Sequence, residues 1–172
     1  MYTICCTRYN NITWNQNVEW RRRNQYIDKC IYGSPKQITE DILFDSNMFV
    51  IEMNNQTNKI VGIGLVANNP TPLIHARKYA VYSEGNYNRY TYFGHHRVDR
   101  DAVTKQEDIR VFDILDYLLF KGTRHCKRAG GITVFPQWIL DIFWRKCGRF
   151  NLAQYIRYLF KEYSLGGREI IW

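Results

Sequence analysis

The densest group of basic side chains in the chain lies in residues 121–131, between glycines that flank it on both sides. Its members are Lys121, Arg124, His125, Lys127 and Arg128. Basic side chains neutralise phosphate charge, and glycine lets backbone N–H groups come close to an anion. This pattern predicts a loop that grips phosphate groups. The alternative is a solvated basic surface with no ligand.

The distribution of charge supports an anionic partner. The 172 residues carry a formal charge of +8, and ten basic against three acidic residues place +7 of it in residues 121–172. Arg outnumbers Lys by 15 to 9, which favours bidentate contacts to phosphates and base edges. We therefore expect RNA or DNA as the partner. A second basic group, Arg21, Arg22 and Arg23, is expected to contact phosphates as well.

Two tryptophans lie in the polar, Asn-rich residues 9–24, where burial in a core needs a separate explanation. Aromatic rings stack on unpaired bases, and side-chain amides read base edges. We therefore predict a pocket for one base in a single strand. Its candidates are Trp14, Asn15, Asn17, Trp20, Tyr79, Tyr82, Tyr87, His95 and Arg97. Alternatively, the two tryptophans cap the end of a β-barrel. Trp138 and Trp144 follow an apolar helical pattern and are expected in the core.

A second cluster offers different chemistry. His95, His96 and Asp99 precede three further carboxylates at Asp101, Glu107 and Asp108. Imidazoles beside carboxylates can act as acid and base or bind a divalent ion, so an enzyme that processes nucleic acids or nucleotides is the alternative function. Acidic residues at a helix N-terminus explain the same pattern without chemistry. Because no nucleophile elbow, phosphate loop or Cys-x-x-Cys accompanies the cluster, we expect no catalytic residue, no metal and no cofactor.

Cysteine usage and hydropathy predict the cellular setting. The five cysteines are odd in number and irregularly spaced, which indicates reduced thiols. No apolar run approaches the about 20 residues of a membrane helix, and residues 1–6 lack the pattern of a signal peptide. We expect a cytoplasmic or nuclear protein without a membrane partner, and the sequence leaves its oligomeric state open.

Hydrophobic periodicity places these residues on the elements of an α+β fold. Strands are expected over 2–8, 48–53, 59–66, 90–98 and 132–135, and helices over 107–120, from Pro136 and over 152–163. Residues 9–24 are expected to form a loop or a short helix, and 67–89 a long connection. Gly62 and Gly64 lie on one strand face, where they are expected to admit a close backbone or a ligand. His95 and Arg97 are expected on one side of their strand.

The order of these elements resembles the PUA-like superfamily, most closely its EVE and YTH branches. The segment MFVIEMNNQTNKIVGIGLV (48–66), whose second strand contains Gly62-Ile63-Gly64-Leu65-Val66, carries the resemblance, which extends by layout over residues 2–135. It implies a small, partly open β-barrel flanked by helices over residues 1–135, with 136–172 as a helical extension of a single domain. It also implies RNA or DNA binding, with one base, often modified, in an aromatic cage.

The resemblance assigns roles to particular aromatic residues. In YTH-type domains one cage tryptophan follows the first strand, where this chain has Trp14 and Trp20. A second tryptophan lies in the loop after the hairpin, where this chain has only tyrosines. This departure implies a cage that is weaker or shaped for a base other than methylated adenine.

The run FKGTRHCKRAGGIT (120–133) resembles in style proteins of large DNA viruses. A third function is therefore a viral module in an infected host cell, binding a host protein through its basic C-terminal helices.

Overall fold

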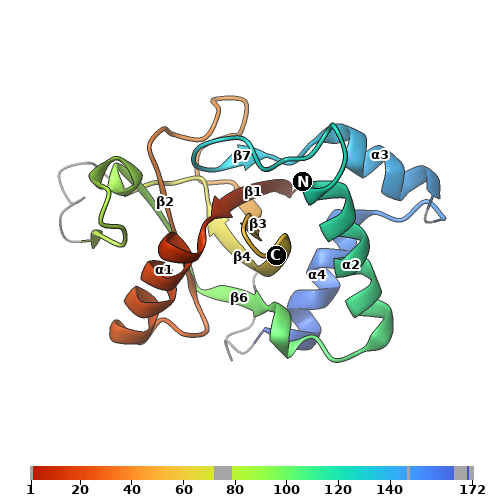
Figure 1. Cartoon of the computed structure of the whole chain (residues 1–172), viewed down its shortest axis with the longest axis horizontal. Coiled ribbons are helices and arrows are strands. Elements are labelled where there is room, and N and C mark those ends of the chain that lie inside the picture. The colour runs from red at the N-terminus through yellow and green to blue at the C-terminus, as the bar shows by residue number, and fades with distance from the viewer. Residues whose placement is uncertain (1, 72–78, 147, 165–169, 171–172) are drawn as a thin grey trace.

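A five-stranded mixed sheet forms the centre of the molecule (Figure 1). The computed structural model describes residues 2–71, 79–146, 148–164 and 170. The strands of the sheet are, in spatial order, β6 (His96–Asp99), β4 (Lys59–Ala67), β3 (Asn47–Asn54), β1 (Thr3–Tyr9) and β7 (Thr133–Val134). β1 and β3 run parallel, and the other neighbours are antiparallel. A separate two-stranded sheet pairs β2 (Cys30–Ser34) with β5 (Tyr90–Gly94).

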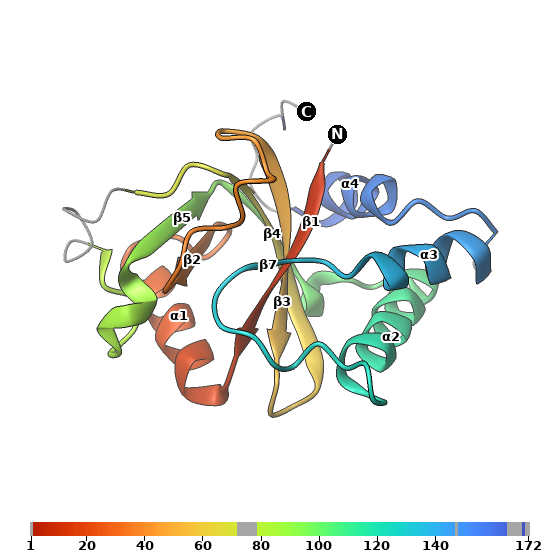
Figure 2. The same cartoon turned by 90° about the horizontal axis from the view of Figure 1, so that it is seen from above.

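Different layers cover the two faces of the central sheet (Figures 1 and 2). Helices α2 (Gln106–Phe120), α3 (Gln137–Lys146) and α4 (Leu152–Tyr163) lie on one side. Helix α1 (Asn11–Arg23) and the β2–β5 sheet lie on the other. Two 3-10 helices, η2 (Gly85–Asn88) and η3 (Arg100–Ala102), precede β5 and follow β6.

The sheet separates two hydrophobic cores. Phe49 and Ile51 of β3 pack with the apolar faces of α2, α3 and α4, whereas Met48 and Val50 pack with β2 and β5. Successive side chains of a strand point to opposite faces, so one strand supplies both cores. Burial on both faces explains why β3 reads as an unbroken apolar run rather than as an alternating one.

A buried ion pair lies between the central sheet and α1. Arg97 Nη2 of β6 lies 2.7 Å from Glu52 Oε2 of β3, and each side chain is 2% exposed. Tyr32 of β2 donates to Glu52 Oε1 at 2.8 Å. A Cβ atom on Gly62 would lie 2.4 Å from Arg97 Nη2, and one on Gly64 would lie 2.0 Å from the Tyr32 hydroxyl. The two glycines therefore admit the side chains of this network.

Most predicted elements are present, and the α+β class is confirmed. Residues 9–24 form the helical alternative: Asn10 and Thr13 build a capping box that begins the 13-residue α1. β2 was not predicted. The described residues form no closed barrel, because β2 and β5 make a separate sheet.

Three expectations are wrong. The strand expected over 90–98 is two strands, since β5 pairs with β2 and β6 pairs with β4. His95 lies exposed between them and Arg97 is buried, so the two residues do not share one face. Trp144, expected in the core, is 51% exposed because it lies on the outer side of α3, whereas Trp138 packs against the core.

Candidate functional site

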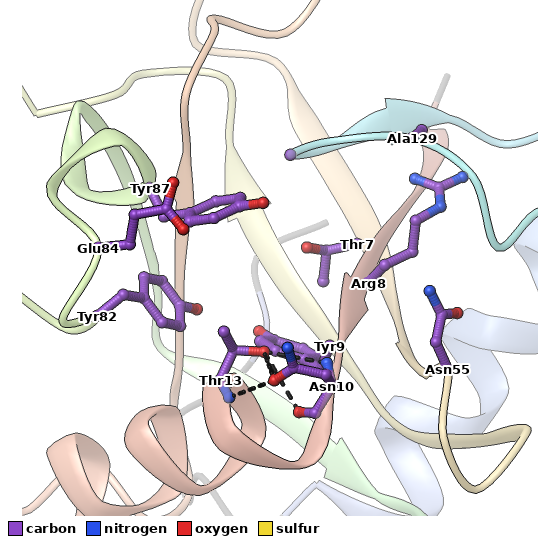
Figure 3. A pocket seen from close by; sticks show the side chains of 12 residues that line it. Thr7, Arg8, Tyr9, Asn10, Thr13, Asn55, Tyr82, Glu84, Tyr87 and Ala129 are labelled. Atoms are coloured by element: carbon purple, nitrogen blue, oxygen red, sulfur yellow. Dashed lines mark hydrogen bonds between the residues drawn. The ribbon is translucent and has the colours of Figure 1, made fainter.

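A cleft of about 250 Å³ opens at the carboxyl end of β1 (Figure 3). β1, α1 and the turn after β3 line one part of it. β2, residues 81–88 (η2 and the residues before it, here called the η2 segment) and the basic loop over residues 121–131 line the rest. The lining residues are Thr7, Arg8, Tyr9, Asn10, Thr13, Gly33, Asn55, Tyr82, Glu84, Tyr87, Ala129 and Gly131. The carboxyl ends of the parallel strands β1 and β3 both reach this cleft, which is where sheets with parallel strands commonly bind ligands.

Two tyrosines form the aromatic wall of the cleft. The ring centroids of Tyr82 and Tyr87 lie 6.2 Å apart at an interplanar angle of 69°. Asn88 Oδ1 accepts from the backbone N–H groups of Val81 and Tyr82 at 2.9 and 3.0 Å, which fixes this segment. A Cβ atom on Gly33 would lie 2.1 Å from the Tyr87 carbonyl oxygen and 2.8 Å from the Tyr82 ring. Glycine at this position therefore allows the wall to pack directly on β2.

Two hydroxyl groups face the interior of the cleft. Figure 3 shows the Thr7 and Tyr87 hydroxyls pointing toward each other from opposite sides. Thr7 is 4% exposed, and neither hydroxyl has a hydrogen-bond partner among the described residues. A hydroxyl both donates and accepts, and neither oxygen is among the buried, unpaired polar atoms of the described residues, so both are open to the cleft. The cleft thus presents two groups that a polar ligand would satisfy.

A hydrogen-bond network behind the wall sets the position of Tyr82. Asn17 Nδ2 donates to the Tyr82 hydroxyl at 3.2 Å and to the Ile31 carbonyl at 2.8 Å. Arg21 Nε in turn donates to Asn17 Oδ1 at 2.9 Å. Burial raises the pKa of Tyr9 well above its ordinary value and also raises the pKa of Tyr82. Both tyrosines therefore remain neutral hydroxyls at neutral pH.

The basic loop is held against the rim of the cleft. Arg8 Nε donates to the Cys126 carbonyl at 2.5 Å, and Arg8 Nη1 donates to Thr133 Oγ1 at 2.8 Å. Asn55 Nδ2 donates to the Lys127 carbonyl at 2.9 Å. Lys127 Nζ donates to Asn58 Oδ1 at 2.8 Å. These bonds fix the basic loop beside the cleft, and the loop residues Ala129 and Gly131 line the cleft.

Two guanidinium groups of the basic loop are available to bind a ligand. Arg124 and Arg128 are exposed and make no hydrogen bond or ion pair within the described part of the chain. Lys121 is exposed near Tyr117, and His125 is half-buried. The other predicted phosphate contacts lie elsewhere. Arg21 is 5% exposed and bound to Asn17.

The pair Arg22 and Arg23 lies at the far end of α1. Both guanidinium groups pair with Glu19, at 3.0 and 3.2 Å. A helix of 13 residues is about 20 Å long at a rise of about 1.5 Å per residue, and the cleft lies at the opposite end of α1. The structure therefore does not bring the two basic groups of the sequence together.

The predicted base-pocket residues fall into separate places. Only Tyr82 and Tyr87 line the cleft. Trp14 lies behind it, with the Cζ atoms of Arg21 and Arg97 at 5.5 and 5.6 Å from its ring centroid.

A second aromatic cluster accounts for two more of these residues. Trp20 packs beside Tyr26 and Phe93, and Tyr79 packs edge-on against Phe93 at 4.8 Å. Asn15 and His95 are exposed away from the cleft lining. Trp14 and Trp20 thus both contact side chains of the protein itself.

The acidic residues near the histidines have structural partners. Asp99 Oδ2 accepts from Arg97 Nη1 at 2.6 Å. Asp108, 1% exposed, accepts from the hydroxyls of Tyr155, Tyr158 and Tyr163, which ties α2 to α4. In the described residues no three His, Cys, Asp or Glu side chains are grouped so that they could hold a metal ion. No helix of this part of the chain is long and apolar enough to cross a membrane.

Comparison of the chain with protein-family models, with curated proteins and with solved structures found no match. The function must therefore be argued from the cleft itself.

Sequence reasoning missed most of the lining residues, namely Thr7, Arg8, Tyr9, Asn10, Thr13, Gly33, Asn55, Glu84 and Ala129. One local signal was available for the position of the cleft. A strand followed at once by Asn10-x-x-Thr13 marks a helix that begins directly at the carboxyl end of that strand. The other lining residues come from segments far apart in the chain, and nothing local to them indicates that they meet.

Proposed function

We propose that the protein binds single-stranded RNA or DNA, with one base in the cleft and the neighbouring phosphates on the basic loop. The observation that carries this proposal is the position of the basic loop: its residues Ala129 and Gly131 line the cleft, and its Arg124 and Arg128 make no hydrogen bond or ion pair with a described residue. An aromatic wall beside free cationic side chains is the combination that single-strand binding uses.

The size and chemistry of the cleft favour a single base. Pockets for drug-sized ligands measure about 300–1,000 Å³, and this one, at about 250 Å³, suits a smaller planar group. Tyr87 offers a face for stacking, and the Thr7 and Tyr87 hydroxyls can bond a base edge. Glu84 on the other rim disfavours a phosphate there, so the backbone would pass on the side of the basic loop.

The order β1, α1, β2 and the β3–β4 hairpin supports a distant relationship to PUA-like domains as part of the same proposal. The cage would then be built from Tyr82 and Tyr87 rather than from Trp14 and Trp20. Two tyrosine rings give less stacking area than two tryptophan rings and leave more of the cleft unfilled by a plain base. We therefore propose a modified base as the preferred ligand, because its added methyl groups would fill that space.

The test is fluorescence anisotropy with labelled single-stranded RNA and DNA oligonucleotides, with and without modified bases, at two salt concentrations. Stacking is worth about 1–3 kcal/mol per base, so Tyr87→Ala should weaken binding by about 5- to 150-fold. Thr7→Val should weaken binding without loss of stability, because the hydroxyl that it removes has no protein partner. Tyr26→Ala, outside the cleft, is the control for the loss of a ring.

The phosphate contacts have a separate readout. Arg124→Ala with Arg128→Ala should weaken binding to every sequence and reduce the slope of log K against log salt by about 1.4, at about 0.7 per phosphate contact. Arg145→Ala with Lys161→Ala makes the same charge change on exposed helical positions of α3 and α4 and should leave the slope close to that of the wild type. Absence of binding to all oligonucleotides, or equal effects of both double variants, would contradict the proposal.

A further inference from the structure

An apolar groove of about 580 Å³ is lined by residues of α2 and α3. Figure 2 shows these two helices on the helical side of the sheet. Ile114, Tyr117 and Leu118 of α2 and Ile142 of α3 line it. Ile114 is 43% exposed and Tyr117 is 64% exposed. Large apolar side chains gathered in one exposed groove are typical of an interaction site rather than of ordinary surface.

The rim of this groove is positively charged. Arg110 and Lys146 border it, and neither makes an ion pair with a described residue. Asp113, the acidic residue of the lining, is already paired with Lys59 at 3.4 Å and with Arg100 at 3.0 Å. The groove therefore fits an apolar segment that has acidic residues beside it.

The chain itself carries such a segment in the turn over residues 40–45. Leu43 and Phe44 are 79% and 72% exposed, more than any other large hydrophobic residue of the described chain. Glu40, Asp41 and Asp45 flank them, are exposed, and make no ion pair with a described residue. The turn thus presents two adjacent apolar side chains within a group of three carboxylates that have no ion-pair partner; Asp41 and Asp45 only accept a hydrogen bond each, from Thr39 and Asn69.

Hydrogen bonds hold this turn in one conformation. Asn68 Nδ2 donates to the Ile42 carbonyl at 2.8 Å, and Ser46 Oγ donates to the Leu43 carbonyl at 2.6 Å. The Asp45 N–H donates to the Asn68 carbonyl at 3.1 Å. The Ile42 side chain is buried and anchors the turn to the core below it. Because the turn is already ordered, docking would cost little conformational entropy.

We propose that the 40–45 turn of one copy of the protein docks in the α2–α3 groove of a second copy. Leu43 and Phe44 enter the groove, and the three carboxylates face Arg110 and Lys146. Turn and groove are different surfaces, so the contact is head-to-tail and each pair leaves one turn and one groove free for further copies. A contact made by one turn is small, and the association is therefore weak and concentration-dependent.

Sedimentation velocity over a range of concentrations tests the pairing. The wild-type protein should shift from 20.6 kDa to larger species as its concentration rises. The double variant Leu43→Ser with Phe44→Ser removes the apolar side chains of the turn. The double variant Ile114→Ser with Tyr117→Ser removes apolar side chains that line the groove. Each variant alone should associate on the order of tenfold more weakly or not at all. Ile12→Ser with Ile27→Ser, at sites 67% and 66% exposed, is the matched control and should associate like the wild type.

Mixing the two variants gives the decisive result. The turn variant keeps an intact groove, and the groove variant keeps an intact turn. The mixture should therefore form one-to-one pairs, and nothing larger, because each pair has no second intact turn or groove left. Added salt should weaken the pairing, because charge complementarity contributes to it. A wild-type protein that stays monomeric, a turn variant that associates normally, or a mixture that stays monomeric would each overturn the proposal. Circular dichroism of the variants, whose changed residues are all exposed, verifies that they fold.

Discussion

Arg97 and Glu52 form an ion pair that is closed to solvent on both sides, with each side chain 2% exposed. Arg97 Nε and Nη2 both donate to the Glu52 carboxylate, at 3.0 and 2.7 Å, and Tyr32 adds a third donor at 2.8 Å. The guanidinium also lies near the ring of Trp14, in the layer directly behind the cleft. This pair fixes β3, β6 and α1 relative to one another.

Removal of one partner from this pair should be strongly destabilising. Glu52→Gln leaves the Arg97 charge buried with only Asp99 beside it, and breaking a buried pair costs about 3–5 kcal/mol. Urea unfolding measures this loss. Replacement of both residues by methionine should cost less than either single change, because no charge is then left buried. Glu19→Gln, which breaks an exposed ion pair, should leave the unfolding midpoint unchanged. If Glu19→Gln lowers the midpoint as much as Glu52→Gln does, burial of the Arg97–Glu52 pair is not the cause of the loss.

The space at Gly64 belongs to the same network. A Cβ atom there would lie 2.0 Å from the Tyr32 hydroxyl and 2.6 Å from Cys30 Sγ. Gly64→Ala should therefore lower the free energy of unfolding by about 1–3 kcal/mol, the usual cost of overpacking. Gly85→Ala is the control, since nothing lies within 4 Å of its added carbon. Thermal unfolding compares the two variants, and equal stability of both would show that the network adapts to the added carbon.

Acid should weaken the fold in part through Asp99. Partial burial opposes its ionisation, but the charge of Arg97 and the hydrogen bond from it outweigh burial and lower the pKa of Asp99. A carboxyl whose pKa is lower in the folded state stabilises the fold above its unfolded pKa of about 3.9. That contribution disappears as the pH falls through the lower folded value.

Urea unfolding between pH 6 and pH 2 measures this dependence. The wild type should lose more stability below about pH 4 than Asp99→Asn, which has no carboxyl to protonate at this position. Asp101→Asn changes an exposed carboxylate two residues along the chain and should follow the wild type. If Asp99→Asn shows the full acid dependence, other carboxyl groups account for it.

Local patterns in the sequence determined most of the secondary structure. Apolar residues at helical spacing predicted α2 and α4, and an apolar run, a polar turn and a second run predicted the β3–β4 hairpin, because these elements follow from neighbouring residues. The charge pattern likewise located the basic loop. β2 carries two small residues in five, CIYGS, and gives a weak local signal.

Tertiary structure decided what the chemistry-bearing residues do. Trp14 and Asn17 looked like ligand contacts, yet β2, β6 and the η2 segment supply the partners that engage them. Arg97 was predicted beside His95, but the chain changes sheets between them and buries only Arg97.

The cleft itself was beyond local prediction. Its lining runs from Thr7 to Gly131 over six segments, and only the long-range pairing of strands brings them together. The sequence by itself determined that a basic loop and a set of aromatic residues exist in an α+β chain. Only the tertiary structure decided that Thr7, Tyr82 and Tyr87 meet beside that loop, because side-chain proximity depends on strand order and on which residues fill the space between layers.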